Sequence, residues 1–120
     1  MHMTDAMDAL LTGRIGLLVR VVANPGQKFA LLDCLNDYCE NLDQEPGTEA
    51  FMISLDSSDE YVIWLYEWFT DQEALEAHRS SEAFAVLMNK MPTLVSGPPG
   101  VLPMNPLRVR LARQPLEQSI

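Results

Sequence analysis

His78 is the residue of this sequence whose type and position best suit acid–base chemistry. It stands at the end of a predicted helix, three residues after Leu75 and six before Phe84, so its ring is expected to face the apolar layer between helices and sheet. An imidazole titrates near neutral pH and could act there as a general base. The alternative is a helix-end histidine that satisfies carbonyl groups or stabilises the helix C-terminus.

Three further polar residues lie in or beside apolar strands. Arg20 and Glu67 each interrupt an otherwise apolar run, and a buried charge needs a partner. An Arg20–Glu67 pair, within one chain or between two, would supply it; the other interpretation is that they orient a polar ligand. Asn24, at the end of the first strand, could donate to a carbonyl or serve the turn that follows.

Aromatic side chains concentrate on the strand predicted at 61–69. Trp64, Tyr66 and Trp68 alternate with a second set that runs from Tyr61 to Phe69, so the two sets lie on opposite sheet faces. One set must face the helices. Aromatic stripes usually form core, and the alternative is a flat apolar ligand pocket lined by part of one set.

The order of elements predicts the fold. β-Branched and apolar runs predict strands, and repeats near every three or four residues predict helices; a capping-box sequence from Thr70 to Glu73 marks one helix start. The predicted strands are 15–23, 48–55, 61–69 and 107–111, and the helices 27–42, 71–79 and 82–91. This β-α-β-β-α(α)-β order is the ferredoxin-like arrangement, an α+β fold with one antiparallel sheet covered by helices on one face.

The strands at 15–23 and 61–69 are apolar on both faces, whereas a sheet with one wet face alternates apolar and polar residues. The helices of one chain can cover only one face. We therefore expect a second copy to cover the other, giving a homodimer with sheet packed on sheet. An exposed aromatic patch is the alternative, and it would be unusual.

The remainder of the chain is assigned by composition. Residues 1–12 are expected to be a disordered leader or tag remnant, and 13–113 a single domain. That domain includes a loop at 95–106 that is rich in proline and glycine. Residues 114–120 are expected to be a C-terminal tail.

The charge of the chain excludes several partners. Its net charge is −9, and thirteen acidic residues fall between Asp33 and Glu76 with no lysine or arginine among them. Such a face repels nucleic acid and anionic membranes, and it can equally be a solubilising surface. No apolar run is long enough to span a membrane, and no secretory signal is visible, so we expect a cytoplasmic protein.

The sequence supports no resident cofactor or metal. It contains no glycine-rich phosphate loop and no nucleophile elbow. Cys34 and Cys39 are five residues apart on a predicted helix, which places them on different faces. Together with two distant histidines they make no metal-ligand pattern.

Four stretches in this order resemble the antibiotic biosynthesis monooxygenase domain. They are VVANPGQ at 21–27, EPGT at 45–48, YEWFTDQEALEAH at 66–78 and SEAF at 81–84. The resemblance spans about 14–94 and implies a dimeric α+β barrel. It also implies a cofactor-independent enzyme that deprotonates a quinol or polyphenolic aromatic substrate, whose anion then reacts with dioxygen.

By the same resemblance, His78 would be the catalytic base or a proton shuttle. Arg20 or Asn24 could hold an oxyanion, and Trp68 and Phe69 could shape the aromatic pocket. Haem degradation, known in a sister group with a ligating histidine near the position of Met88, is disfavoured because no histidine follows His78. A non-catalytic dimeric domain that binds or senses a small apolar ligand, or one with a purely structural role, remains the alternative.

Overall fold

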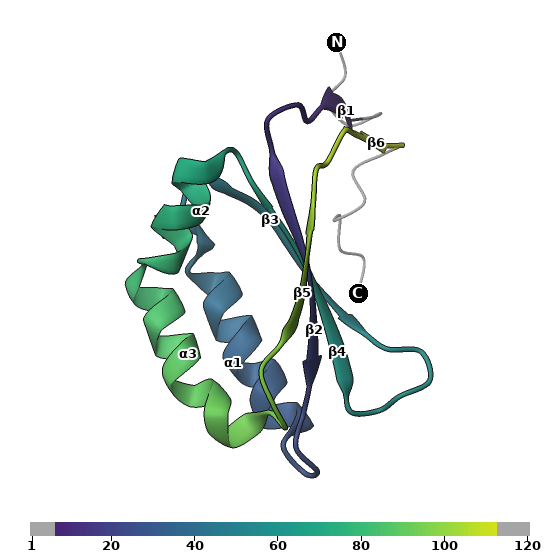
Figure 1. Cartoon of the computed structure of the whole chain (residues 1–120), viewed down its shortest axis with the longest axis vertical. Helices are drawn as coiled ribbons and strands as arrows, with labels where there is room; N and C mark the ends of the chain where they lie inside the picture. Colours follow the sequence, from purple (N-terminus) through teal and green to yellow (C-terminus); the bar gives the residue numbers. More distant parts are fainter. Residues whose placement is uncertain (1–6, 113–120) are drawn as a thin grey trace.

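A four-stranded antiparallel sheet in the order β3-β4-β2-β5 organises the chain (Figure 1). Its strands are β2 (Ile15–Val22), β3 (Thr48–Leu55), β4 (Val62–Phe69) and β5 (Gly100–Met104). The structure is a computed structural model and describes residues 7–112. A separate two-stranded sheet joins β1 (Met7–Leu10) to β6 (Arg108–Leu111). The predicted α+β ferredoxin-like fold is confirmed.

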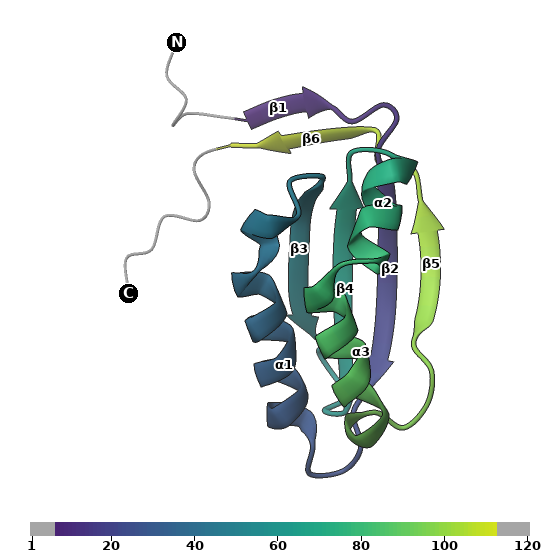
Figure 2. The same ribbon diagram turned by 90° about the vertical axis from the view of Figure 1, so that its left-hand side faces the viewer.

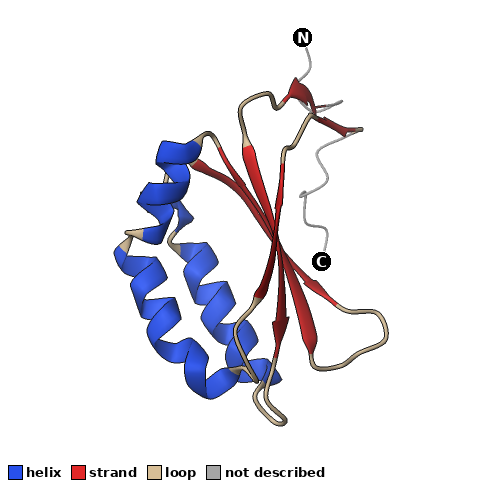
Figure 3. Ribbon diagram, viewed as in Figure 1, coloured by secondary structure: helices blue, strands red, loops and turns tan. Residues whose placement is uncertain are grey.

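All helices lie on one face of the four-stranded sheet (Figure 3). They are α1 (Lys28–Glu40), α2 (Gln72–Arg79) and α3 (Glu82–Leu94), with a short 3-10 helix η1 (Leu42–Gln44) after α1. Within residues 7–112, no helix is long and apolar enough to cross a membrane.

The core forms between this helical layer and the sheet. β2 pairs with β4 so that Leu17, Val19 and Val21 lie opposite Glu67, Leu65 and Ile63, and all six side chains are buried. The buried side chains of α1 are those of Leu31, Leu35 and Tyr38.

Trp64, Tyr66 and Trp68 share the opposite face of the sheet, as predicted. No helix of the described chain covers them (Figure 1). Neighbouring strands add Met52, which is 59% exposed, and Leu102, which is 57% exposed. The outer face of the sheet is thus a broad apolar surface within a single chain.

The chain ends differ from the prediction. The segment predicted as a loop at 95–106 contains β5, which pairs along β2 as the edge strand of the main sheet. Residues 107–111 pair instead with β1, within the segment predicted to be a leader (Figure 2). Leu11 is buried, so this part of the predicted leader belongs to the fold. Residues 1–6 and the whole of the predicted C-terminal tail at 114–120 lie outside the described residues.

Two helix boundaries also differ. Asp71, not Thr70, caps α2, and its side chain accepts a hydrogen bond from the Ala74 amide at 2.8 Å. Helix α3 continues through Pro92 to Leu94, beyond the predicted end near Met91. Pro92 has no amide hydrogen to donate to the Met88 carbonyl four residues earlier, and α3 ends two residues after it.

Candidate active site

The imidazole of His78 is held between two side chains from distant parts of the chain. Its Nδ1 atom lies 2.6 Å from the Tyr38 hydroxyl and 3.0 Å from Oε1 of Glu45. His78 is only 4% exposed, at the end of α2. The prediction that its ring faces the layer between helices and sheet is confirmed. Its Nδ1 atom contacts the side chains of Tyr38 and Glu45, not the carbonyl groups at the end of the helix.

Glu45 organises this cluster from the turn between η1 and β3. Its Oε1 accepts hydrogen bonds from the Tyr38 hydroxyl at 2.9 Å and the Thr48 hydroxyl at 3.0 Å. Its Oε2 accepts one from Ser81 at 3.3 Å. Hydrogen bonds from this many donors compensate the carboxyl group for its burial.

Gly47 allows this turn to approach α2. A Cβ atom added at position 47 would lie 2.5 Å from the Cβ of Ala74. Only glycine avoids that clash without moving the helix. The EPGT sequence therefore sets Glu45 beside the end of α2, where His78 stands.

The hydrogen bonds around Nδ1 favour one tautomer of the ring. With the Tyr38 hydroxyl donating to Glu45, both oxygen atoms near Nδ1 can accept a hydrogen bond from it. This arrangement favours the neutral tautomer with the ring proton on Nδ1 and the lone pair on Nε2. A carboxylate that holds a histidine in this tautomer is the arrangement by which enzymes orient a general base.

Nε2 faces a second buried carboxyl group. Oε1 of Glu67 lies 3.6 Å away, longer than an ordinary hydrogen bond. Burial raises the pKa of Glu67 from its usual 4.5 to about 7, with the charge of Glu45 adding to the rise and Arg79 opposing it. Burial also lowers the pKa of His78, although Glu45 opposes that shift. Near neutral pH the imidazole is therefore uncharged.

His78 and Glu67 line a cavity of about 150 Å³ between the helices and the sheet. The cavity is otherwise mostly apolar, and α3 supplies Phe84, Leu87 and Met91 to its wall. Phe84 packs on the His78 ring with 4.6 Å between ring centroids. The site therefore combines an apolar chamber with a buried imidazole and a buried carboxyl group.

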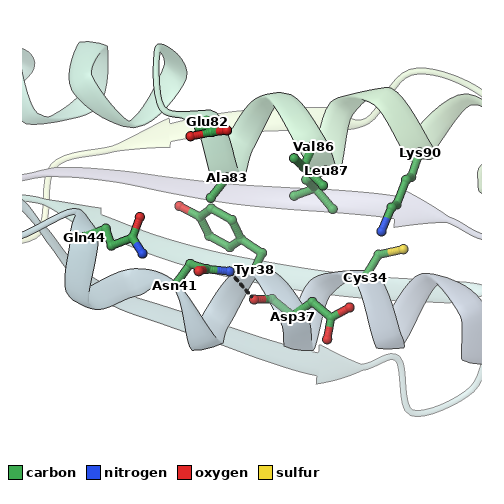
Figure 4. Close-up of a pocket in the computed structure, with 10 residues that line it drawn as sticks. All are labelled: Cys34, Asp37, Tyr38, Asn41, Gln44, Glu82, Ala83, Val86, Leu87 and Lys90. Atoms are coloured by element: carbon green, nitrogen blue, oxygen red, sulfur yellow. Dashed lines mark hydrogen bonds between the residues drawn. The ribbon is translucent and has the colours of Figure 1, made fainter.

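Two larger surface pockets reach the other side of the cluster. A groove of about 310 Å³ between α1 and α3 has Tyr38 on its wall, with Asp37, Glu82 and Lys90 around it (Figure 4). A pocket of about 380 Å³ is lined by Glu45, Thr48 and Ser81 among others. The Tyr38–Glu45 pair thus separates these polar pockets from the apolar cavity.

Of the other predicted site residues, only Phe69 contacts the His78 ring. Arg20 is exposed and Trp68 half-buried, and both project from the outer face of the sheet, away from the cavity. Asn24 joins the end of β2 to α3, where its side chain donates to the Thr93 carbonyl at 3.3 Å. Phe69 is fully buried and packs against the His78 ring at 5.0 Å.

The suggested Arg20–Glu67 pair within one chain is wrong. Arg20 lies opposite Trp64 in the register of β2 and β4, while Glu67 lies opposite Leu17. Odd and even positions point to opposite faces of a strand, so the two side chains are separated by the sheet itself.

Sequence reasoning missed Tyr38 and Glu45 as members of the site. Tyr38 follows Leu31 by seven residues on α1, a helical repeat that could have identified it as inward-facing. Glu45 was visible only as part of the EPGT stretch. Among the described residues, no group of three histidine, cysteine or acidic side chains is arranged to hold a metal ion.

The fold and the buried cluster define a ferredoxin-like α+β protein with a mostly apolar cavity between its helices and its sheet. The model of the antibiotic biosynthesis monooxygenase family matches residues 14–90, and the chain belongs to that family. A comparison with curated proteins found no match.

Solved structures are similar over most of the chain. A Caulobacter crescentus protein provisionally named an antibiotic biosynthesis monooxygenase is 18% identical, with a TM-score of 0.74, over 80% of this chain and 92% of its own. A Pseudomonas aeruginosa protein is 21% identical, with a TM-score of 0.72, over 81% and 97%. A Nitrosomonas europaea protein of unknown function is 28% identical, with a TM-score of 0.66, over 88% and 96%.

Proposed function

We propose that the protein is a cofactor-independent monooxygenase that oxidises a quinol or polyphenolic aromatic small molecule with dioxygen, and that His78 is its catalytic base. The observation that carries this proposal is the orientation of one ring. Nδ1 of His78 is engaged by Glu45 and Tyr38, and Nε2 faces an apolar cavity beside Glu67.

As a base, His78 would remove a proton from a phenol bound in the cavity. A phenol placed in the cavity can give its hydroxyl proton to Nε2, and Glu45 then stabilises the imidazolium that forms. The resulting phenolate is electron-rich, and the apolar walls exclude water that would otherwise solvate its charge. Proton removal thus prepares the substrate to react with dioxygen.

The overall reaction balances without an external reductant. For a dihydroxybenzene, one oxygen atom of dioxygen forms a new bond to a ring carbon, and the O–O bond breaks. The ring loses four electrons and becomes a hydroxyquinone, while the second oxygen atom leaves as water. Four electrons lost by the substrate equal the four that dioxygen gains.

The proposal includes a homodimer formed through the outer face of the sheet. Its exposed Met52 and Leu102 flank the half-buried aromatic set of Trp64, Tyr66 and Trp68. The Trp68 indole N–H is buried without a hydrogen-bond partner among the described residues. A second copy would cover this surface and could supply an acceptor.

Oxygen uptake with a panel of substituted hydroquinones and catechols tests the function, measured above the autoxidation background. We expect uptake by the native protein and its loss in His78→Asn. Asparagine can still donate to Glu45 through its amide but cannot act as a base, so the cluster should survive. Lys90→Ala, on the exposed groove, is the control that should keep full activity.

Uptake that His78→Asn leaves unchanged would exclude His78 as the base. A folded native protein that binds phenols without consuming oxygen would instead be the non-catalytic ligand-binding domain of the alternative hypothesis.

A further inference from the structure

The two ends of the buried cavity differ in chemistry. The register of β2 and β4 sets Glu67 opposite Leu17 at one end and Ile63 opposite Val21 towards the other. His78 and Phe84 stand at the Glu67 end, because α2 runs into the start of α3 there. Away from that end, the lining side chains are aliphatic or thioether groups and Pro99.

The rim of the cavity's opening is also mostly apolar. We take the rim to be the lining residues that are exposed to solvent, and three of these are Met88, Pro99 and Val101. They belong to α3, to the segment before β5 and to β5 itself, which lie along the same side of the molecule (Figure 2). Arg79 is the charged exception, beside His78 at the polar end.

The cavity is also small. Its volume of about 150 Å³ is below the roughly 300–1,000 Å³ of pockets that bind drug-sized ligands. A single aromatic ring with a short substituent suits this size, whereas a fused polycyclic substrate does not.

We propose that the cavity selects single-ring phenols that carry their hydroxyl groups on one edge and a short hydrocarbon substituent on the other. A catechol with an alkyl group is the simplest member of this class. Its two adjacent hydroxyl groups would face His78 Nε2 and the Glu67 carboxyl, which are 3.6 Å apart, and its alkyl group would lie between α3 and β5. This inference rests on the proposed function of the same site.

A para-hydroquinone fits the cavity less well than a catechol does, because its two hydroxyl groups lie on opposite edges of the ring. With one hydroxyl at His78, its second hydroxyl points to the apolar end and meets no polar side chain. A buried hydroxyl without a hydrogen-bond partner weakens binding. Glu67 is therefore the residue that determines specificity for phenols with two adjacent hydroxyl groups over those with hydroxyl groups on opposite edges of the ring.

Two isomers of identical composition test the inference: 4-ethylcatechol and 2-ethylhydroquinone. Their dissociation constants are measured by calorimetry under anaerobic conditions, so that neither is oxidised. We expect the catechol to bind roughly tenfold more tightly to the native protein. The ratio should fall towards one in Glu67→Leu, which removes the polar partner, and remain unchanged in Glu76→Leu, the same change on the exposed face of α2.

Equal affinities, tighter binding of the hydroquinone, or no binding of either isomer to the folded protein would overturn the inference. Oxygen uptake is then measured separately on both isomers. A catechol preference without uptake would support the ligand class while contradicting the monooxygenase function. Oxygen uptake with equal affinity for the two isomers would support the monooxygenase function while contradicting the ligand class.

Discussion

Nε2 of His78 lies 3.6 Å from Oε1 of Glu67, and the two side chains are 4% and 7% exposed at the same end of one cavity. One group comes from a helix end and the other from the middle of a central strand. Burial lowers the pKa of the imidazole and raises the pKa of the carboxyl group, so it favours the uncharged form of both side chains. The pair therefore places a group that can donate a proton and a group that can accept one at the same end of an apolar cavity.

The stability of the protein should decrease as the pH rises through the range in which Glu67 ionises. Its pKa is about 7 in the folded chain and near 4.5 when unfolded, so the folded state binds the proton more tightly. The contribution favours folding fully below about pH 4.5 and is lost as the pH rises through about 7. The loss amounts to roughly 3 kcal/mol for a shift of this size.

Glu67→Gln isolates this effect, because glutamine cannot ionise. The unfolding free energy of the variant, relative to that of the native protein, should increase between pH 5 and pH 8 in urea titrations. A difference independent of pH would show that Glu67 titrates normally. Glu49→Gln, at a site whose carboxylate is partly exposed, provides the matched control.

Tyr38→Phe should destabilise the fold by about 1–3 kcal/mol, because it removes a donor to a buried carboxylate and a group in contact with Nδ1 of His78. Thermal and urea unfolding measure the change. The matched substitution Tyr61→Phe alters a tyrosine that is 40% exposed and should cost less than about 0.5 kcal/mol. Equal effects of the two substitutions would contradict the assigned role of the Tyr38 hydroxyl.

The tautomer of His78 can be observed directly. In ¹⁵N NMR spectra, Nδ1 should appear protonated and Nε2 unprotonated at neutral pH, with the resonances assigned by their loss in His78→Asn. Glu45→Gln should lower the pKa of His78 further, since the Glu45 carboxylate raises it. A proton on Nε2 in the native protein would remove the lone pair that the mechanism requires.

Leu102→Asp should disrupt the proposed homodimer, because it places a charge in the apolar outer face of the sheet, where Leu102 is 57% exposed. Sedimentation of the variant should indicate a monomer under conditions in which the native protein is a dimer. Phe29→Asp, at a residue 76% exposed on α1, should leave the dimer intact. A native protein that sediments as a monomer would exclude this interface.

Local sequence patterns predicted most of the fold and one member of the site. Apolar strands and helical repeats carry their signal within a few residues, so β2, β4 and the environment of His78 were predictable. β5 was not, because its Pro103 and the prolines before it are typical of a loop. An edge strand nevertheless tolerates proline, since one side of its backbone needs no partner.

The hydrogen-bonding cluster could not be predicted in the same way. Tyr38 and Glu45 are 40 and 33 residues from His78 along the chain, and only the packing of α1 and α2 on the same face of the sheet and the tight turn at Gly47 bring them together. Arg20 and Glu67 illustrate the converse. Both are charges in apolar strands, yet the parity of their positions places them on opposite faces.

Turnover of a catechol under ¹⁸O₂ tests the central claim most directly, with product and water analysed by mass spectrometry at short times. We expect one labelled oxygen atom in each product molecule and the other in water, with both signals lost in a folded His78→Asn protein. Product without label, or labelling that persists at the native rate in His78→Asn, would contradict the assignment of His78 as the base of a monooxygenase.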